Sequence, residues 1–303
     1  MNERYPRIRL HAKSGQLLVR EGLSFNFYMR HPHKEVAPCV MRSLDAYLSA
    51  IGPKSLGWYA DEDGYWQELD DAGWALTRRQ LLEGSRFSCH LDDAVSGHKH
   101  YRFEYYGKLL EDPLQGPEDV CAVGFWLPTE YLEEHGPEHV RELALKLAQP
   151  LPFCSGHAGL SFNGELDLLG VMREVRQRAF RHPGIDILEL DRVCWQLGTR
   201  VRGAFWLNFL GPPVLGELGG AEGLHKRLSA PEVSIQELEG GRAVVTLGQW
   251  PEAGDTERGH TLPAYRELAH VLEPRLYYQK PLRSLDSSAE ETHRWERRFL
   301  DSP

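Results

Sequence analysis

Apolar residues along the chain are spaced in two ways, one typical of strands and one typical of helices. Runs rich in β-branched and aromatic residues predict strands at 17–29, 101–106, 121–127, 156–162 and 204–211. The first run fits either one strand or a hairpin, because Gly22 lies within it and is expected to mark a turn or a bulge. Residues 233–238 and 242–248 flank Gly240-Gly241 and predict a hairpin.

Amphipathic helices are predicted between these strands. Apolar positions recur at helical spacing in 40–51, 75–84, 137–149, 166–180, 223–228 and 261–274. Residues 137–149 are the clearest part of a helical region that is expected to start at Pro128-Thr129. In the last of these, Thr261 is the expected N-cap and Pro263 lies in the first turn. Because strands and helices alternate while a hairpin also occurs, the predicted fold class is α+β, with mixed or antiparallel sheets and packed amphipathic helices.

The domain organisation follows from this pattern and from the length of 303 residues, which suits one large domain or two small ones. We expect a single domain over residues 1–280, with two similar α/β halves at about 1–150 and 151–280 as a possible subdivision. From about residue 280 the chain becomes polar, so residues 281–303 are predicted to be a polar C-terminal tail.

Composition indicates a globular protein of a reducing compartment. Hydrophobic residues make up 41% and charged residues 26%. The five cysteines are odd in number and widely spaced, which argues against a disulfide framework and for buried thiols. The N-terminal MNERYPRIRL carries charges where an export signal needs apolar residues, and the uncharged run 203–216 is too short to cross a bilayer. We therefore expect a cytoplasmic protein without a membrane partner.

Net charge narrows the class of partner. The formal charge of −9 disfavours nucleic acid as a direct ligand, because binding phosphates requires a cationic surface. It favours attraction to a partner protein with a basic surface.

The densest group of acids is the stretch DEDGYWQELDDAG at residues 61–73. Its candidate partner-binding residues are Asp61, Glu62, Asp63, Tyr65, Trp66, Glu68, Asp70 and Asp71. The spacing excludes an EF-hand, since the glycine falls at position four and Ala72 at position twelve. A solvated acidic turn and a surface that meets a cationic protein both fit, and Trp66 suits either a binding contact or the core beneath the turn.

A second acidic region extends from Leu109 to Val140, where eight acids occur without a Lys or Arg. The candidates for partner binding there are Glu111, Asp112, Glu118 and Asp119. Such runs are often solvated faces, but two of them with aromatic residues nearby also suit recognition of a basic protein.

Catalytic chemistry has little support in the sequence. The chain has no nucleophile elbow, no Walker A loop and no dinucleotide-binding fingerprint. The pairs His31/His33 and His98/His100 lack a third ligand at a known spacing and are interpreted as surface histidines. We therefore predict no catalytic residues, no metal site and no cofactor. An enzyme that uses dispersed Asp, Glu and His residues, such as a hydrolase or a metal-dependent enzyme, is the alternative.

Five blocks of the chain, taken together, resemble the type VI secretion immunity family in their order and spacing. They lie at 58–84, 125–162, 181–187 (RHPGIDI), 205–220 (FWLNFLGPPVLGELGG) and 247–276. Members of that family are non-enzymatic antidotes encoded beside toxic effectors, several of which resemble nucleases. The resemblance implies a cytosolic protein that binds one effector and blocks its active site or substrate groove. A structural adaptor of the secretion apparatus is a further alternative.

Overall fold

The computed structural model describes residues 4–95, 100–113, 115–279 and 289–301. In this part of the chain eleven strands form one sheet, in the order β10-β11-β9-β8-β2-β7-β6-β5-β3-β4, with β1 paired to β2. The strands are β1 Arg9–His11, β2 Leu17–Met29, β3 Trp58–Ala60, β4 Trp66–Glu68, β5 Phe87–Asp92, β6 Arg102–Gly107, β7 Cys121–Pro128, β8 Ser155–Gly164, β9 Leu207–Leu210, β10 Val233–Leu238 and β11 Arg242–Leu247. All pairings between these strands are antiparallel, which confirms the antiparallel form of the predicted α+β fold.

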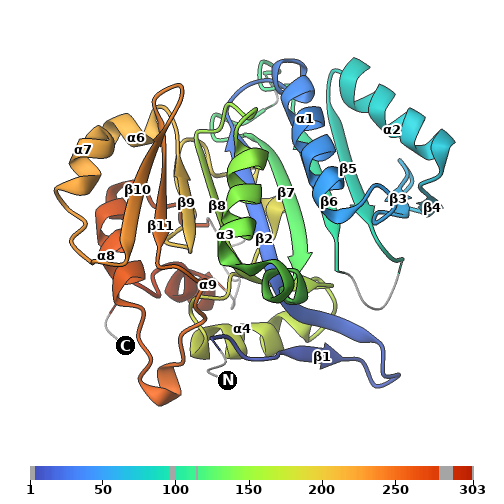
Figure 1. Ribbon diagram of the computed structural model, residues 1–303. Coiled ribbons are helices and arrows are strands. Elements are labelled where there is room, and N and C mark those ends of the chain that lie inside the picture. The colour runs from blue at the N-terminus through green and yellow to red at the C-terminus, as the bar shows by residue number, and fades with distance from the viewer. Residues whose placement is uncertain (1–3, 96–99, 114, 280–288, 302–303) are drawn as a thin grey trace.

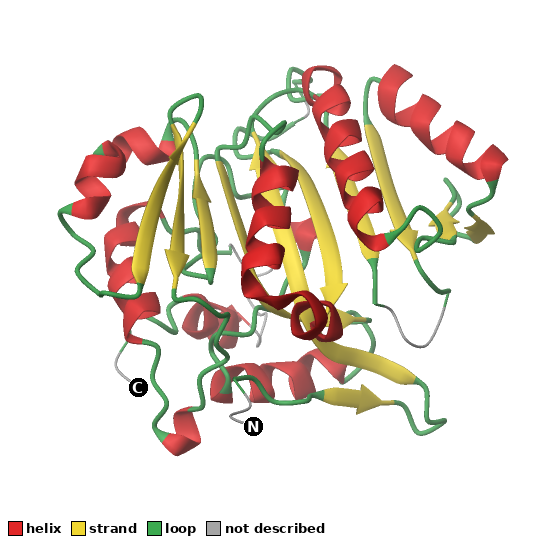
Figure 2. Cartoon of the chain, viewed as in Figure 1, coloured by secondary structure: helices red, strands yellow, loops and turns green. Residues whose placement is uncertain are grey.

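Helices cover both faces of the sheet, as Figure 2 shows by the red coils in front of and behind the yellow strands. The α-helices are α1 His33–Ile51, α2 Asp71–Glu83, α3 Thr129–Ala148, α4 Val171–Arg181, α5 Leu190–Val193, α6 Val214–Glu217, α7 Gly220–His225, α8 Pro263–Leu272 and α9 Ala289–Glu296. Two short 3-10 helices, η1 Thr256–Arg258 and η2 Glu273–Arg275, flank α8. In Figure 1, α1 and α3 lie in front of the central strands.

Strand β2 occupies the middle of the sheet and pairs with β7 on one side and β8 on the other. Gly22 is paired on both sides within this continuous strand, so the expected turn or bulge is wrong. A Cβ atom at Gly22 would lie 2.2 Å from the side-chain nitrogen of Asn163. Glycine is therefore needed there for a close approach between strands rather than for a change of direction.

The two faces of the sheet belong to different cores, because successive side chains of a strand point in opposite directions. Phe27 and Val123 join the largest core, which includes the buried faces of α1 and α3. Their neighbours Tyr28 and Ala122 point the other way and pack with Leu190 of α5. A third core lies between α8 and the strands β9 and β11.

Most of the predicted helices and strands are present, with different ends. Helix α2 begins four residues earlier than predicted. Helix α3 begins at Thr129, where the helical region was expected to start, and is kinked at Gly136, whose φ is 80°. Helix α4 begins at Val171, five residues later than predicted. Thr261 is not the N-cap of α8, because Leu262 occupies that position and Pro263 follows it.

The C-terminal segment that was expected to be a polar tail is folded where it is described. Residues 289–296 form α9, and Trp295 and Phe299 are buried. Trp295 meets Phe180 of α4 edge to face, with 5.9 Å between ring centroids. Residues 280–288 lie outside the described part of the chain. The division of the chain into one domain or two halves stays a prediction.

Candidate interaction surface

The predicted acidic stretch forms a hairpin at one edge of the sheet, consisting of β3, the turn 61–65 and β4 (Figure 1). Asp61 shapes the turn. Its carboxylate accepts hydrogen bonds from the backbone N–H groups of Asp63, at 3.1 Å, and Tyr65, at 2.8 Å. The Gln67 side chain donates a third at 2.8 Å, and these hydrogen bonds, that of Gln67 first, lower the pKa of Asp61. Asp61 is thus occupied within the hairpin itself.

Asp70 is the N-cap of α2. Its backbone is extended, and its carboxylate accepts a hydrogen bond from the backbone N–H of Gly73 at 2.8 Å. A short polar side chain at this position satisfies one of the N–H groups that the first turn of a helix leaves without a partner. The role of Asp70 is therefore structural.

The other four acids of the stretch, Glu62, Asp63, Glu68 and Asp71, point to solvent and are exposed. Among the described residues none of these four carboxylates forms an ion pair with Lys, Arg or His, although Glu62 accepts a hydrogen bond from Gln80 at 3.2 Å. Together with Tyr65, which is 69% exposed, they form a surface that we call the acidic hairpin. Trp66, beside them, is half-buried.

An open groove of about 640 Å³ lies next to the acidic hairpin. This groove is lined by Asp61, Glu62 and Asp63 of the hairpin, by Arg86, and by Phe87 at the start of β5. Helix α2 contributes Leu76, Thr77 and Gln80, and the groove extends to Gly107 at the end of β6. We call it the hairpin groove.

The second acidic region lies at the same end of the sheet. Phe87 at the start of β5 pairs with Gly107 at the end of β6, and Tyr106 pairs with Ala122 near the start of β7. The α2–β5 and β6–β7 connections therefore lie side by side, although they are far apart in sequence.

The four candidates in the β6–β7 connection differ in their exposure and contacts. Asp119 is buried and accepts a hydrogen bond from the backbone N–H of Gly116 at 3.0 Å. Glu118 forms an ion pair with Arg200 at 2.9 Å. Asp112 is half-buried, whereas Glu111 is exposed and has no ion pair among the described residues. Glu111 is thus the candidate of this region that is most available to a partner.

Three acids of α3 are paired with arginines. Although no Lys or Arg lies between Leu109 and Val140, strands β1 and β2 and the segment before them bring three arginines against the helix, and Arg141 of α3 itself pairs with Glu138 at 3.4 Å. Arg7 pairs with Glu133 at 2.8 Å and Arg9 with Glu130 at 3.1 Å, and Arg20 also pairs with Glu130. The charges of Glu130 and Glu133 are therefore compensated by residues more than a hundred positions away.

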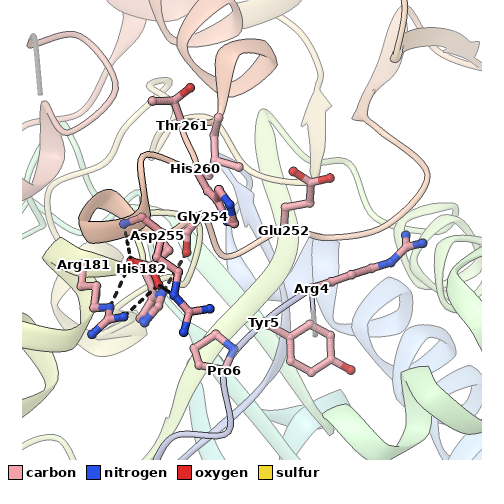
Figure 3. A pocket seen from close by; sticks show the side chains of 12 residues that line it. Arg4, Tyr5, Pro6, Arg181, His182, Glu252, Gly254, Asp255, His260 and Thr261 are labelled. Atoms are coloured by element: carbon pink, nitrogen blue, oxygen red, sulfur yellow. Dashed lines mark hydrogen bonds and ion pairs between the residues drawn. The ribbon is translucent and has the colours of Figure 1, made fainter. Parts of the chain in front are cut away.

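A larger pocket of about 830 Å³ lies at another part of the surface, between the N-terminal residues 4–6, the end of α4 and the loop 252–262 (Figure 3). Its charges are mostly paired with one another. Arg181 donates to both carboxylate oxygens of Asp255, at 3.1 and 2.9 Å, and pairs with Glu257 at 2.6 Å. His182 shares a hydrogen bond of 2.7 Å with the carbonyl of Gly254. These contacts hold the loop onto α4.

Metal and thiol chemistry have no evident site in the described residues. No group of three or more His, Cys, Asp or Glu side chains there is arranged to hold a metal ion. His33 is buried and lies 2.8 Å from the hydroxyl of Tyr105, so its interpretation as a surface histidine is wrong, and His98 lies outside the described residues. All five cysteines are free, and Cys39 is the one that is only partly buried.

Searched over its described residues, the chain contains no helix with the length and apolar character needed to cross a membrane.

Comparison with known proteins supports the architecture. The solved structure of Pseudomonas aeruginosa T6SS protein PA0821 has the same fold, with a TM-score of 0.78 and 19% sequence identity. The match covers 97% of this chain and 87% of that one. A search of the curated proteins gives no significant match. The model of the TsiV family, described as type VI immunity for VRR-NUC, matches residues 39–299, and the chain therefore belongs to this family of immunity proteins.

Proposed function

We propose that this protein binds its cognate VRR-NUC effector directly and neutralises it by covering the active site or the nucleic-acid groove. Membership of an immunity family for VRR-NUC nucleases supports the partner. In this proposal the protein binds the effector in the cytoplasm, does not act as an enzyme and requires no cofactor.

The observation that carries the proposal is the acidic hairpin. A nuclease must present cationic groups to the phosphates of its substrate. Four exposed carboxylates that form no ion pair with any described residue lie beside an open groove and offer such a surface a competing set of anions. Charges of this kind act mainly on the rate of association, because they steer the partners together before contact. A stable complex of standard size would bury roughly 1,600 Å² in total.

The experiment measures association with the effector for a variant that removes the four exposed charges: Glu62→Gln, Asp63→Asn, Glu68→Gln and Asp71→Asn. Asp61 and Asp70 are kept because they hold the turn and the start of α2. We expect the association rate at low salt to fall by about tenfold and its salt dependence to weaken.

A matched control removes four exposed acids near the opposite edge of the sheet, with Glu222, Glu232, Glu237 and Glu239 changed to Gln. This control has the same net charge as the hairpin variant and should associate much faster than it. Equal rates for the two variants would show that the hairpin is not the steering surface.

A further inference from the structure

Trp195 is an exposed aromatic residue that the sequence patterns do not mark. It follows α5 on the face of the sheet opposite α1, and 53% of it is exposed to solvent. Large aromatic side chains are normally buried, and those that are not are enriched at protein interfaces. Neither the fold nor the acidic hairpin explains why this indole remains at the surface.

A buried lysine holds the indole in place. The ammonium nitrogen of Lys108 lies 3.4 Å from the centroid of the Trp195 ring and donates a hydrogen bond of 2.7 Å to the carbonyl of Cys194. Burial lowers the pKa of Lys108, although nearby anionic groups oppose this shift. One face of the indole is thus fixed by a cation–π contact. A side chain held in this way loses little conformational entropy when a partner covers its other face.

The two segments that meet near Trp195 each include an exposed acid. The carbonyl of Cys194 also accepts the backbone N–H of Val120 at 3.0 Å, and Gly198 donates to the carbonyl of Glu118 at 2.8 Å. These bonds join the loop after α5 to the second acidic region. Asp191 is exposed and, within the described residues, has no ion pair, as is also true of Glu111.

Trp195 and the hairpin groove lie at the same end of the sheet. Gly107 lines the groove, and the next residue, Lys108, supports the indole. A partner that reaches around this end of the sheet can contact the groove on the side of α2 and the indole on the side of α5.

We infer that Trp195 is the apolar anchor of the effector-binding surface, where an apolar side chain of the VRR-NUC effector covers the free face of the indole. This inference rests on the proposed function. Basic residues of the effector beside that side chain face Asp191, an exposed acid of the helix that precedes the indole, and Glu111, an exposed acid three residues after Lys108. The acidic hairpin governs the approach of the partners, and the anchor governs how long the complex lasts.

The test compares the affinity of the wild-type protein and Trp195→Ala for the effector. We expect binding to weaken on the order of 30-fold, mostly through faster dissociation, while its salt dependence stays unchanged. Leu169→Ala serves as a matched control, because Leu169 is a fully exposed apolar residue before α4. This control should bind as the wild type does.

A second measurement needs no variant and so does not depend on folding of the mutant. Hydroxyl-radical labelling of Trp195 should be strong in the free protein and suppressed in the complex. Unchanged labelling of Trp195, or an unchanged affinity of Trp195→Ala, overturns the anchor while leaving the proposed function intact. Failure of the wild-type protein to bind the effector overturns the proposed function and the anchor with it.

Discussion

Acidic residues that are neighbours in the sequence have different roles, because their carboxylates face different backbone groups. Asp61 and Asp70 each face backbone N–H groups, of a turn and of a helix start, and these contacts fix them in the fold. Glu62 and Asp63, one and two residues away from Asp61, point outward and remain available. At the scale of single residues, geometry therefore distinguishes acids that build the hairpin from acids that a partner can meet.

Asp255 is the clearest case of a structural carboxylate, and it leads to a prediction about pH. Hydrogen bonds from Arg181 lower the pKa of Asp255 from the ordinary value of 3.8 to about 2. The unfolded chain therefore takes up this proton at a higher pH than the folded chain, so that the stabilising effect is complete above about pH 4 and is lost as the pH falls toward 2. We expect Asp255→Asn to be less stable than the wild type at pH 7.

Measurement of unfolding by denaturant between pH 7 and pH 2 checks this expectation. The stability difference between the wild type and Asp255→Asn should shrink across the interval from pH 4 to pH 2. Glu252→Gln provides the control, because Glu252 lies in the same loop, is exposed and has no ion pair among the described residues. A difference that stays constant over the whole range contradicts the assigned role of the Arg181–Asp255 pair.

At the scale of elements, the long segments were predictable and the short or polar ones were not. Strand β7 and helix α1 have apolar patterns that continue over many residues, so that their type is evident from sequence. Strands β3 and β4 have three residues each, too few for a pattern. Helix α9 is mostly polar, and its place depends on partners far away in sequence, such as Arg202, which lies 3.9 Å from Glu296.

The role of α9 can be tested at Trp295. This residue is buried against Phe180, so replacement by Ala should cost about 3–5 kcal/mol of unfolding free energy. Trp295→Phe should cost clearly less, because the buried indole N–H has no hydrogen-bond partner in the described structure and its removal leaves no polar group unsatisfied. Denaturant unfolding of both variants gives the comparison. A stability of Trp295→Ala equal to that of the wild type would contradict the packing of α9 against α4.

At the scale of the whole molecule, the positions of the charged residues on the surface matter more for partner binding than the net charge of −9. The sequence correctly indicated the family through the five blocks. It could not show that arginines of the N-terminal segment compensate the acids of α3, because that pairing depends on the register of the sheet. Nor could it show that the hairpin, the groove and Trp195 share one end of the sheet, which follows from strand pairings between distant segments.

The central claim, that the protein neutralises a VRR-NUC effector by direct binding, is tested most directly by titrating the protein into the purified, active effector and following cleavage of nucleic acid. The account predicts that cleavage stops at stoichiometric amounts of the wild-type protein. When the inhibitor and the nucleic acid are added to the effector at the same moment, more of the four-charge hairpin variant than of the wild type is needed, because the variant associates more slowly. Full cleavage in the presence of an excess of folded wild-type protein would contradict the account.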